Sequence, residues 1–91
     1  MKLIYRYPMT VVENSKLELP VGAKVLSIEA IDNELYANVL IDQMMNRRTI
    51  YEFKIFSANQ GIESLKGFTF KASCRLKIGM LHIFEREKGQ D

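Results

Sequence analysis

The stretch that decides the fold is Phe68-Thr69-Phe70-Lys71-Ala72-Ser73-Cys74-Arg75-Leu76-Lys77-Ile78. Every second side chain in it is apolar or small, and the side chains between them are polar, three of them cationic. Successive side chains of a strand point to opposite faces of a sheet. The alternation therefore predicts a β-strand with a buried apolar face, which includes Phe68 and Phe70, and a solvated basic face.

Shorter runs of the same character occur along the rest of the chain. The predicted strands are Lys2–Tyr7, Lys16–Leu19, Lys24–Ile31, Glu34–Ile41, Arg48–Phe56 and Met80–Glu85. Turn residues separate them, and Asp32-Asn33 predicts a tight hairpin because both residues tolerate positive φ. At most one short helical turn is expected, over Ile62 to Leu65. The fold is predicted to be all-β, a small antiparallel sandwich or a partly open barrel of about 6–7 strands.

Length and composition indicate one domain of a protein without disulfides. Residues 1–85 are expected to form a single β domain, and residues 86–91 a frayed polar tail. The single cysteine, Cys74, cannot form an intramolecular disulfide, which fits a reducing compartment. Neither a signal peptide nor an apolar run of about 20 residues is visible, so we expect a cytoplasmic protein that does not enter membranes.

Several pieces of the sequence together carry a family resemblance. They are Ile4-Tyr5-Arg6-Tyr7-Pro8, residues 19–27 (LPVGAKVLS), Phe53-Lys54-Ile55-Phe56, Gly67-Phe68-Thr69-Phe70 and His82-Ile83-Phe84-Glu85. In this order the chain resembles a family of short, uncharacterised proteins of tailed phages and prophages. The resemblance implies a small β fold, no catalytic residues, and action inside an infected bacterium on a host or defence component. The chain departs from it at residues 57–61, where members have a loop centred on Thr-Gly.

The sequence gives little support for catalysis, and we expect neither enzymatic activity nor a metal or cofactor. The exception would be chemistry by Cys74 with His82, the single histidine, if a hairpin brought the two side chains together. Against this, Cys74 shares the apolar side of its strand with Leu76, and a buried cysteine behaves as a small hydrophobic residue. The carboxylates are scattered and form no converging acid–base pair.

The basic side of the 68–78 stretch predicts an anion-binding surface as the alternative function. The candidate residues for nucleic acid or an anionic nucleotide are Lys66, Lys71, Arg75 and Lys77, joined by Arg47 and Arg48 if the two strands pair. Small β modules that bind nucleic acid combine such cations with exposed aromatic rings, whereas Phe68 and Phe70 are expected to face the core. The competing interpretation is that these cations protect a sheet edge against unwanted pairing.

An apolar group on nominally outward positions predicts the leading function, protein binding. The candidate interface residues are Tyr36, Leu40, Met44, Met45 and Ile50, which form one patch if the loop around Met44 joins its flanking strands as a hairpin. Exposed apolar patches mark partner surfaces, and methionine suits adaptable contacts. We therefore expect a non-catalytic phage-encoded accessory protein that binds a host or phage protein, for example as an inhibitor of host defence, with self-association through this patch as a further expectation.

Overall fold

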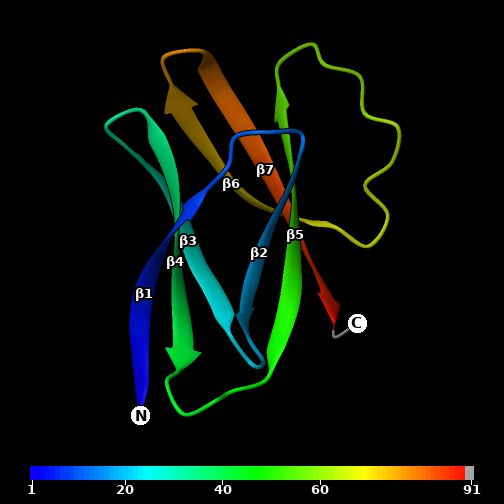
Figure 1. Ribbon diagram of the computed structural model, residues 1–91. Helices are drawn as coiled ribbons and strands as arrows, with labels where there is room; N and C mark the ends of the chain where they lie inside the picture. The colour runs from blue at the N-terminus through cyan, green and yellow to red at the C-terminus, as the bar shows by residue number, and fades with distance from the viewer. Residues whose placement is uncertain (90–91) are drawn as a thin grey trace.

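The computed structural model describes residues 1–89, with side chains through Glu87. These residues form seven antiparallel strands in two sheets (Figure 1). The strands are β1 (Lys2–Met9), β2 (Asn14–Pro20), β3 (Lys24–Ile31), β4 (Glu34–Asp42), β5 (Arg48–Ser57), β6 (Thr69–Leu76) and β7 (Gly79–Gly89). The first sheet has the order β1-β4-β3, and the second has the order β2-β5-β7-β6. The predicted all-β sandwich is confirmed, and no helix forms within residues 1–89, which agrees with the prediction of at most one short helical turn.

The core lies between the two sheets, where the alternating residues of the central strands meet. In β4 the inward residues Leu35, Ala37 and Val39 have at most 1% of their surface exposed, and in β5 the side chain of Phe53 is fully buried. On β7, Ile83 closes the same core from beside β5. The alternation of the sequence predicts that the odd-numbered residues of β4 and of β5 share the inward face, and this is confirmed, because a regular pleat preserves the alternation along both strands.

Two hairpin ends hold the sheets together along one side. Asp32 and Asn33, between β3 and β4, both have positive φ (50° and 65°), as a type I′ hairpin turn requires. The side-chain oxygen of Asn33 accepts a hydrogen bond of 2.6 Å from the backbone N–H of Lys77, in the turn between β6 and β7. The thiol of Cys74 donates to the carbonyl of Ile28 on β3. The edges of the two sheets at β3 and β6 are therefore in direct contact.

β-Bulges in β3 and β6 break the alternation that the sequence predicts. The alternation over Lys24–Ile31 predicts that Leu26 faces inward together with Ile28. One bulge lies in β3 between Val25 and Ser27, and as a result Val25 is buried and Leu26 is 42% exposed. The other lies in β6 between Phe70 and Ala72, and Lys71 is its extra residue. A bulge places two residues opposite one on the partner strand, so the residues before it change face. The prediction that Phe70 is buried is therefore wrong, since this side chain is 58% exposed. Ile78, in the turn after β6, is 74% exposed.

The last strand is longer than the sequence indicates. A frayed tail was expected from Arg86, but β7 continues to Gly89, with Arg86 opposite Glu52 and Glu87 opposite Tyr51 of β5. Residues 90–91 of that expected tail lie outside the described residues. Residues 1–89 contain no helix that is long and apolar enough to cross a membrane.

Candidate functional site

Aromatic side chains gather on the outer face of the second sheet, the side that points away from the core. Phe84 of β7 lies directly opposite Phe70 of β6, and their ring centroids are 5.6 Å apart at 75°. Phe56 of β5 contacts the other side of Phe84, with centroids 6.3 Å apart at 65°. Such edge-to-face contacts are the preferred geometry of aromatic pairs. We call Phe56, Phe68, Phe70 and Phe84 the aromatic face.

The four rings differ in exposure. Phe70 is 58% exposed, Phe68 and Phe84 are partly buried, and Phe56 is only 4% exposed although it points away from the core. The loop after β5 lies beside Phe56, since Gly61, Glu63 and Ser64 line a pocket together with it. The solvent-accessible part of the aromatic face therefore lies over β6 and β7, with Phe70 as its most exposed ring.

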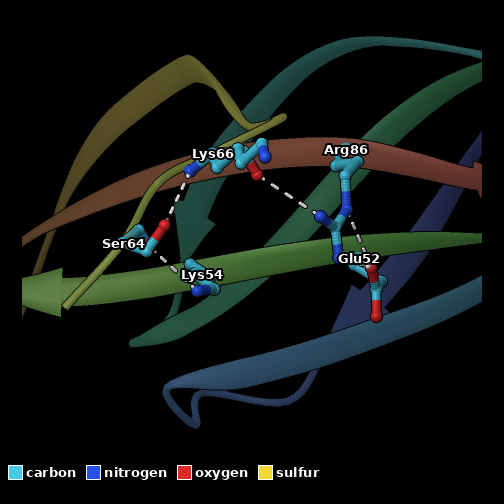
Figure 2. Close-up of polar contacts among 5 residues, drawn as sticks. All are labelled: Glu52, Lys54, Ser64, Lys66 and Arg86. Atoms are coloured by element: carbon cyan, nitrogen blue, oxygen red, sulfur yellow. Dashed lines mark hydrogen bonds and ion pairs between the residues drawn. The ribbon is translucent and has the colours of Figure 1, made fainter. Parts of the chain in front are cut away.

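Two cations on the same face hold Phe68 and the loop before β6. The guanidinium carbon of Arg86 lies 4.4 Å from the centre of the Phe68 ring, and the Lys54 ammonium lies 5.0 Å from it, both within cation–π range. Lys54 donates to the carbonyl of Ser64 at 2.9 Å, and Arg86 donates to the carbonyl of Lys66 at 3.3 Å (Figure 2). These contacts fix the segment that carries Phe68 to the sheet.

Arg86 is in turn oriented by a carboxylate. Its Nη2 and Nε donate to Oε1 of Glu52 at 2.6 and 3.1 Å, in a charge-assisted pair on the facing strand (Figure 2). Gly67 fits against the Arg86 side chain because it has a φ of +82° and no Cβ; a Cβ there would lie 3.1 Å from Cδ of Arg86. The sequence Lys66-Gly67-Phe68 is thus suited to this close approach.

Polar groups continue the face beyond Phe70. Ser73 lies opposite His82, and the Ser73 Oγ and His82 Nδ1 share a hydrogen bond of 2.7 Å. Arg75 follows two residues later on the same side of β6 and is exposed. The pairing of Cys74 with His82, the one catalytic arrangement that the sequence suggested, does not form: Cys74 lies opposite Leu81 and points into the core. Burial, and to a lesser extent the charge of Glu29, raises the pKa of the Cys74 thiol, which disfavours its reactive thiolate form.

The basic residues predicted from the sequence do not form one surface. Because β7 separates β5 from β6, Arg47 and Arg48 lie at the far end of the second sheet beside Pro20 rather than next to Arg75. Lys71, the bulge residue, is turned toward the inner side and lies 3.4 Å from a carboxylate oxygen of Glu85. Lys77 is exposed in the β6–β7 turn. Lys66 and Arg75 remain at the two ends of the aromatic face, and Lys54 and Arg86 lie between them, over the ring of Phe68.

The apolar patch predicted as a protein interface is also divided. The patch would form only if the strands that carry Leu40 and Ile50 paired as a hairpin, but β4 and β5 lie in different sheets (Figure 1). Tyr36 and Leu40 are on the outer face of the first sheet, and Ile50 is on the outer face of the second. Of the two methionines in the connecting loop, Met44 is 78% exposed, whereas Met45 is partly buried and lines a small pocket beside Leu40.

A third pocket of about 310 Å³ opens between the sheets. Tyr51, Lys71, Glu85 and Glu87 are among its lining residues. The Tyr51 hydroxyl donates to the carbonyl of Ala23, and burial, followed by the charge of Glu87, raises its pKa to about 12. The carboxylates here face neighbouring cations and a phenol, and residues 1–87 contain no cluster of three or more histidine, cysteine or acidic side chains placed to hold a metal ion.

The sequence contained one signal for the aromatic face. Consecutive apolar residues occur at Ile55-Phe56 and Ile83-Phe84, and two adjacent strand residues cannot both point to the same side. One member of each pair therefore had to point outward, and the register places both outward rings on one face. The position of the bulge at Lys71 has no comparable signal, because the alternation of the sequence continues through it.

Comparison with protein-family models matches residues 1–91 to a domain of unknown function (DUF7352). No curated protein matches the chain. No solved structure matches it either.

Proposed function

We propose, for a chain that belongs to the DUF7352 family of unknown function, that it is a binding module for single-stranded nucleic acid and that the aromatic face is its contact surface. The observation that carries the proposal is the outward position of Phe70, 58% exposed and supported edge-to-face by Phe84. Exposed rings on a β-sheet give unpaired bases a surface on which to stack, and this stacking tolerates any base. A duplex would hide its bases from Phe70, so single strands fit this surface better.

The charges around the rings support the same ligand. Lys54 lies directly opposite Phe84, Arg86 follows on β7, and Arg75 and Lys66 lie at the two ends of the face. Cations beside stacking rings can contact the phosphates that connect the stacked bases. Glu52 offsets part of this charge at Arg86, so we expect modest affinity with a marked dependence on salt.

The Ser73–His82 pair supplies hydrogen-bonding groups at the level of the rings. A hydroxyl and an imidazole can each donate or accept, so together they can contact a base edge or a phosphate oxygen. His82 shares the outer side of β7 with Phe84, two residues away. A base stacked on Phe70 would therefore have polar partners on the strand that already supports the ring.

Fluorescence anisotropy with a labelled oligothymidine of about 12 nucleotides tests the proposal, since such a probe can span one small β module. We expect saturable binding at low salt, and a slope of log affinity against log salt of about −0.7 for each phosphate contact. The Phe70→Ala substitution should cost about 1–3 kcal/mol of binding free energy, the range for one stacked base.

The matched control is Met44→Ala, which removes an even more exposed apolar side chain from the β4–β5 loop. It should bind like the wild-type protein, and a duplex of the same length should bind more weakly than the single strand. Absence of binding at low salt, or equal losses in the two variants, would contradict the proposal.

Protein binding is the second candidate, and one observation on the first sheet favours it. Ile4 of β1 is 62% exposed and lies directly opposite Leu40 of β4 on the outer face. Adjacent apolar side chains at solvent-facing positions are typical of partner surfaces. In this role the protein would be a cytoplasmic accessory protein of a phage that binds a host or phage protein. A partner captured from infected cells by the wild-type protein, and lost with Leu40→Glu but retained with Phe70→Ala, would support this candidate over the first.

A further inference from the structure

The backbone of β1 has one side free, and the hydrogen-bond register shows which groups lie there. Within the described residues β1 pairs with β4 alone and is the outermost strand of the first sheet (Figure 1). The N–H of Gln43 donates to the carbonyl of Met1 at 3.0 Å, one position before the Lys2–Asp42 pair. In an antiparallel ladder, hydrogen-bonded and non-hydrogen-bonded pairs alternate. The odd residues of β1 therefore bond to β4, and the N–H and C=O groups of the even residues point to the free edge.

The side chains of β1 fit this assignment. Pro8, which has no N–H, is an even residue and so leaves the ladder with β4 intact. Ile4 is 62% exposed and Tyr5 is 54% exposed, although Tyr5 lies on the inner side of the sheet, in ring contact with Tyr7 at 4.9 Å. The edge thus combines free backbone groups with apolar side chains on both faces.

We propose that a second copy of the chain occupies this edge, with the two β1 strands antiparallel about a two-fold axis at Tyr5. Tyr5 then faces the second copy's Tyr5 in a non-hydrogen-bonded pair, and Ile4 exchanges two backbone hydrogen bonds with the second copy's Arg6. Lys2 donates to the carbonyl of the second copy's Pro8, whereas the Lys2 carbonyl receives no bond in return because proline has no N–H. The two three-stranded sheets join into one six-stranded sheet.

The charges of β1 are compatible with this register and disfavour its two neighbours, which supports a second copy as the occupant. Centred on Tyr5, neither cation lies opposite another: Lys2 faces proline and Arg6 faces isoleucine. A register centred on Ile4 would place Lys2 against Arg6, and one centred on Arg6 would place two arginines together, which is unfavourable across a strand pair. Lysine, arginine and proline commonly protect a free edge from pairing. In this register neither cation meets a like charge, and proline removes only the outermost bond at each end of the pair, because Ile4 and Arg6 keep both of theirs.

Site-specific cysteine cross-linking tests the proposed register. The α-carbons of a non-hydrogen-bonded antiparallel pair are about 4.5 Å apart, which a disulfide can span. We expect Tyr5→Cys to form a covalent dimer under mild oxidation. Ile4→Cys, one residue away and more exposed, should not, because its counterpart lies diagonally across the pair. The wild-type protein is the background control, since its one thiol, Cys74, is buried. Equal cross-linking of both variants, or of neither, would overturn the register.

Sedimentation of unmodified protein tests the dimer itself. We expect a concentration-dependent dimer that Ile4→Lys weakens about 10-fold, because the substitution puts like charges opposite each other twice. Ile78→Lys, the same change at a site 74% exposed in the β6–β7 turn, should leave the association unchanged. A wild-type protein that stays monomeric over the whole concentration range, or equal effects of the two lysine variants, would overturn the proposal.

Discussion

Phe70 and Phe84 face each other across β6 and β7 on the solvent side of the second sheet, with ring centroids 5.6 Å apart. The pair exists because Lys71 is inserted as the extra residue of a β-bulge. Ala72 and Cys74 beyond the bulge point to the core, whereas Phe70 before it points outward. The surface that we propose for nucleic acid thus depends on one inserted residue.

The outward position of Phe70 predicts an unequal response of two phenylalanines to truncation. Phe53→Ala removes a fully buried side chain and should cost about 3–5 kcal/mol of unfolding free energy. Phe70→Ala leaves no internal cavity and should cost about 1 kcal/mol or less, mainly the edge-to-face contact with Phe84. Urea denaturation measures both values. Similar losses for the two variants would mean that Phe70 lies in the core.

Arg86 should control the order of the loop between β5 and β6. Replacing it with glutamine removes the pair with Glu52, the hydrogen bond to the Lys66 carbonyl and the contact with Phe68. We expect faster hydrogen exchange over residues 58–68 and a loss of about 1–2 kcal/mol in stability, because the pair is partly solvated. Arg75→Gln, on the same face but exposed, is the control. Equal exchange in the two variants would argue against this role of Arg86.

The raised pKa of Tyr51 leads us to expect a loss of stability at alkaline pH. Its pKa in the folded protein is raised from 10 to about 12, chiefly by burial. The unfolded chain therefore releases this proton first, and the stability associated with neutral Tyr51 is present below pH 10 and falls as the pH rises toward 12. Absorbance titration of tyrosinate should show a late step that Tyr51→Phe removes. If the variant keeps that step, a different tyrosine is the late one.

Cys74 should be unreactive while the protein is folded. Its side chain is 8% exposed and burial raises the pKa of the thiol, so we expect it to react with Ellman's reagent far more slowly than free cysteine. Unfolding in denaturant should restore the full rate. Cys74→Ala combined with Ser73→Cys moves the thiol to the neighbouring, exposed position and should react quickly when folded. A fast wild-type reaction would instead point to a functional thiol.

The sequence predicted the strands well because their alternation is local. The strand over Lys24–Ile31 has the predicted limits, and β4 and β5 have the predicted faces. The Asp32-Asn33 turn was found from residue type alone, since positive φ is tolerated by few residues. These features depend only on residues that are close together in the chain, so the local sequence pattern is enough to predict them.

The grouping of the candidate residues could not be predicted from the sequence, because it depends on contacts that are not local. No local pattern in the sequence indicates that β4 and β5 belong to different sheets, and this arrangement separates Leu40 from Ile50. Nor does it tell that β7 lies between β5 and β6, which separates Arg48 from Arg75. The bulge at Lys71 is stabilised by an ion pair with Glu85, fourteen positions further along the chain. Register and strand order, rather than strand propensity, decide which side chains share a surface.

The most direct test of the central claim is an amide-resolved NMR titration of the protein with a short single-stranded oligonucleotide at low salt. If the aromatic face is the contact surface, the shift changes should cluster around Phe70, Ser73, His82 and Phe84. The amide chemical shifts of the first sheet, such as those of Tyr36 and Val39, should not change. Shift changes centred on β1 and β4, or none at all, would contradict the account.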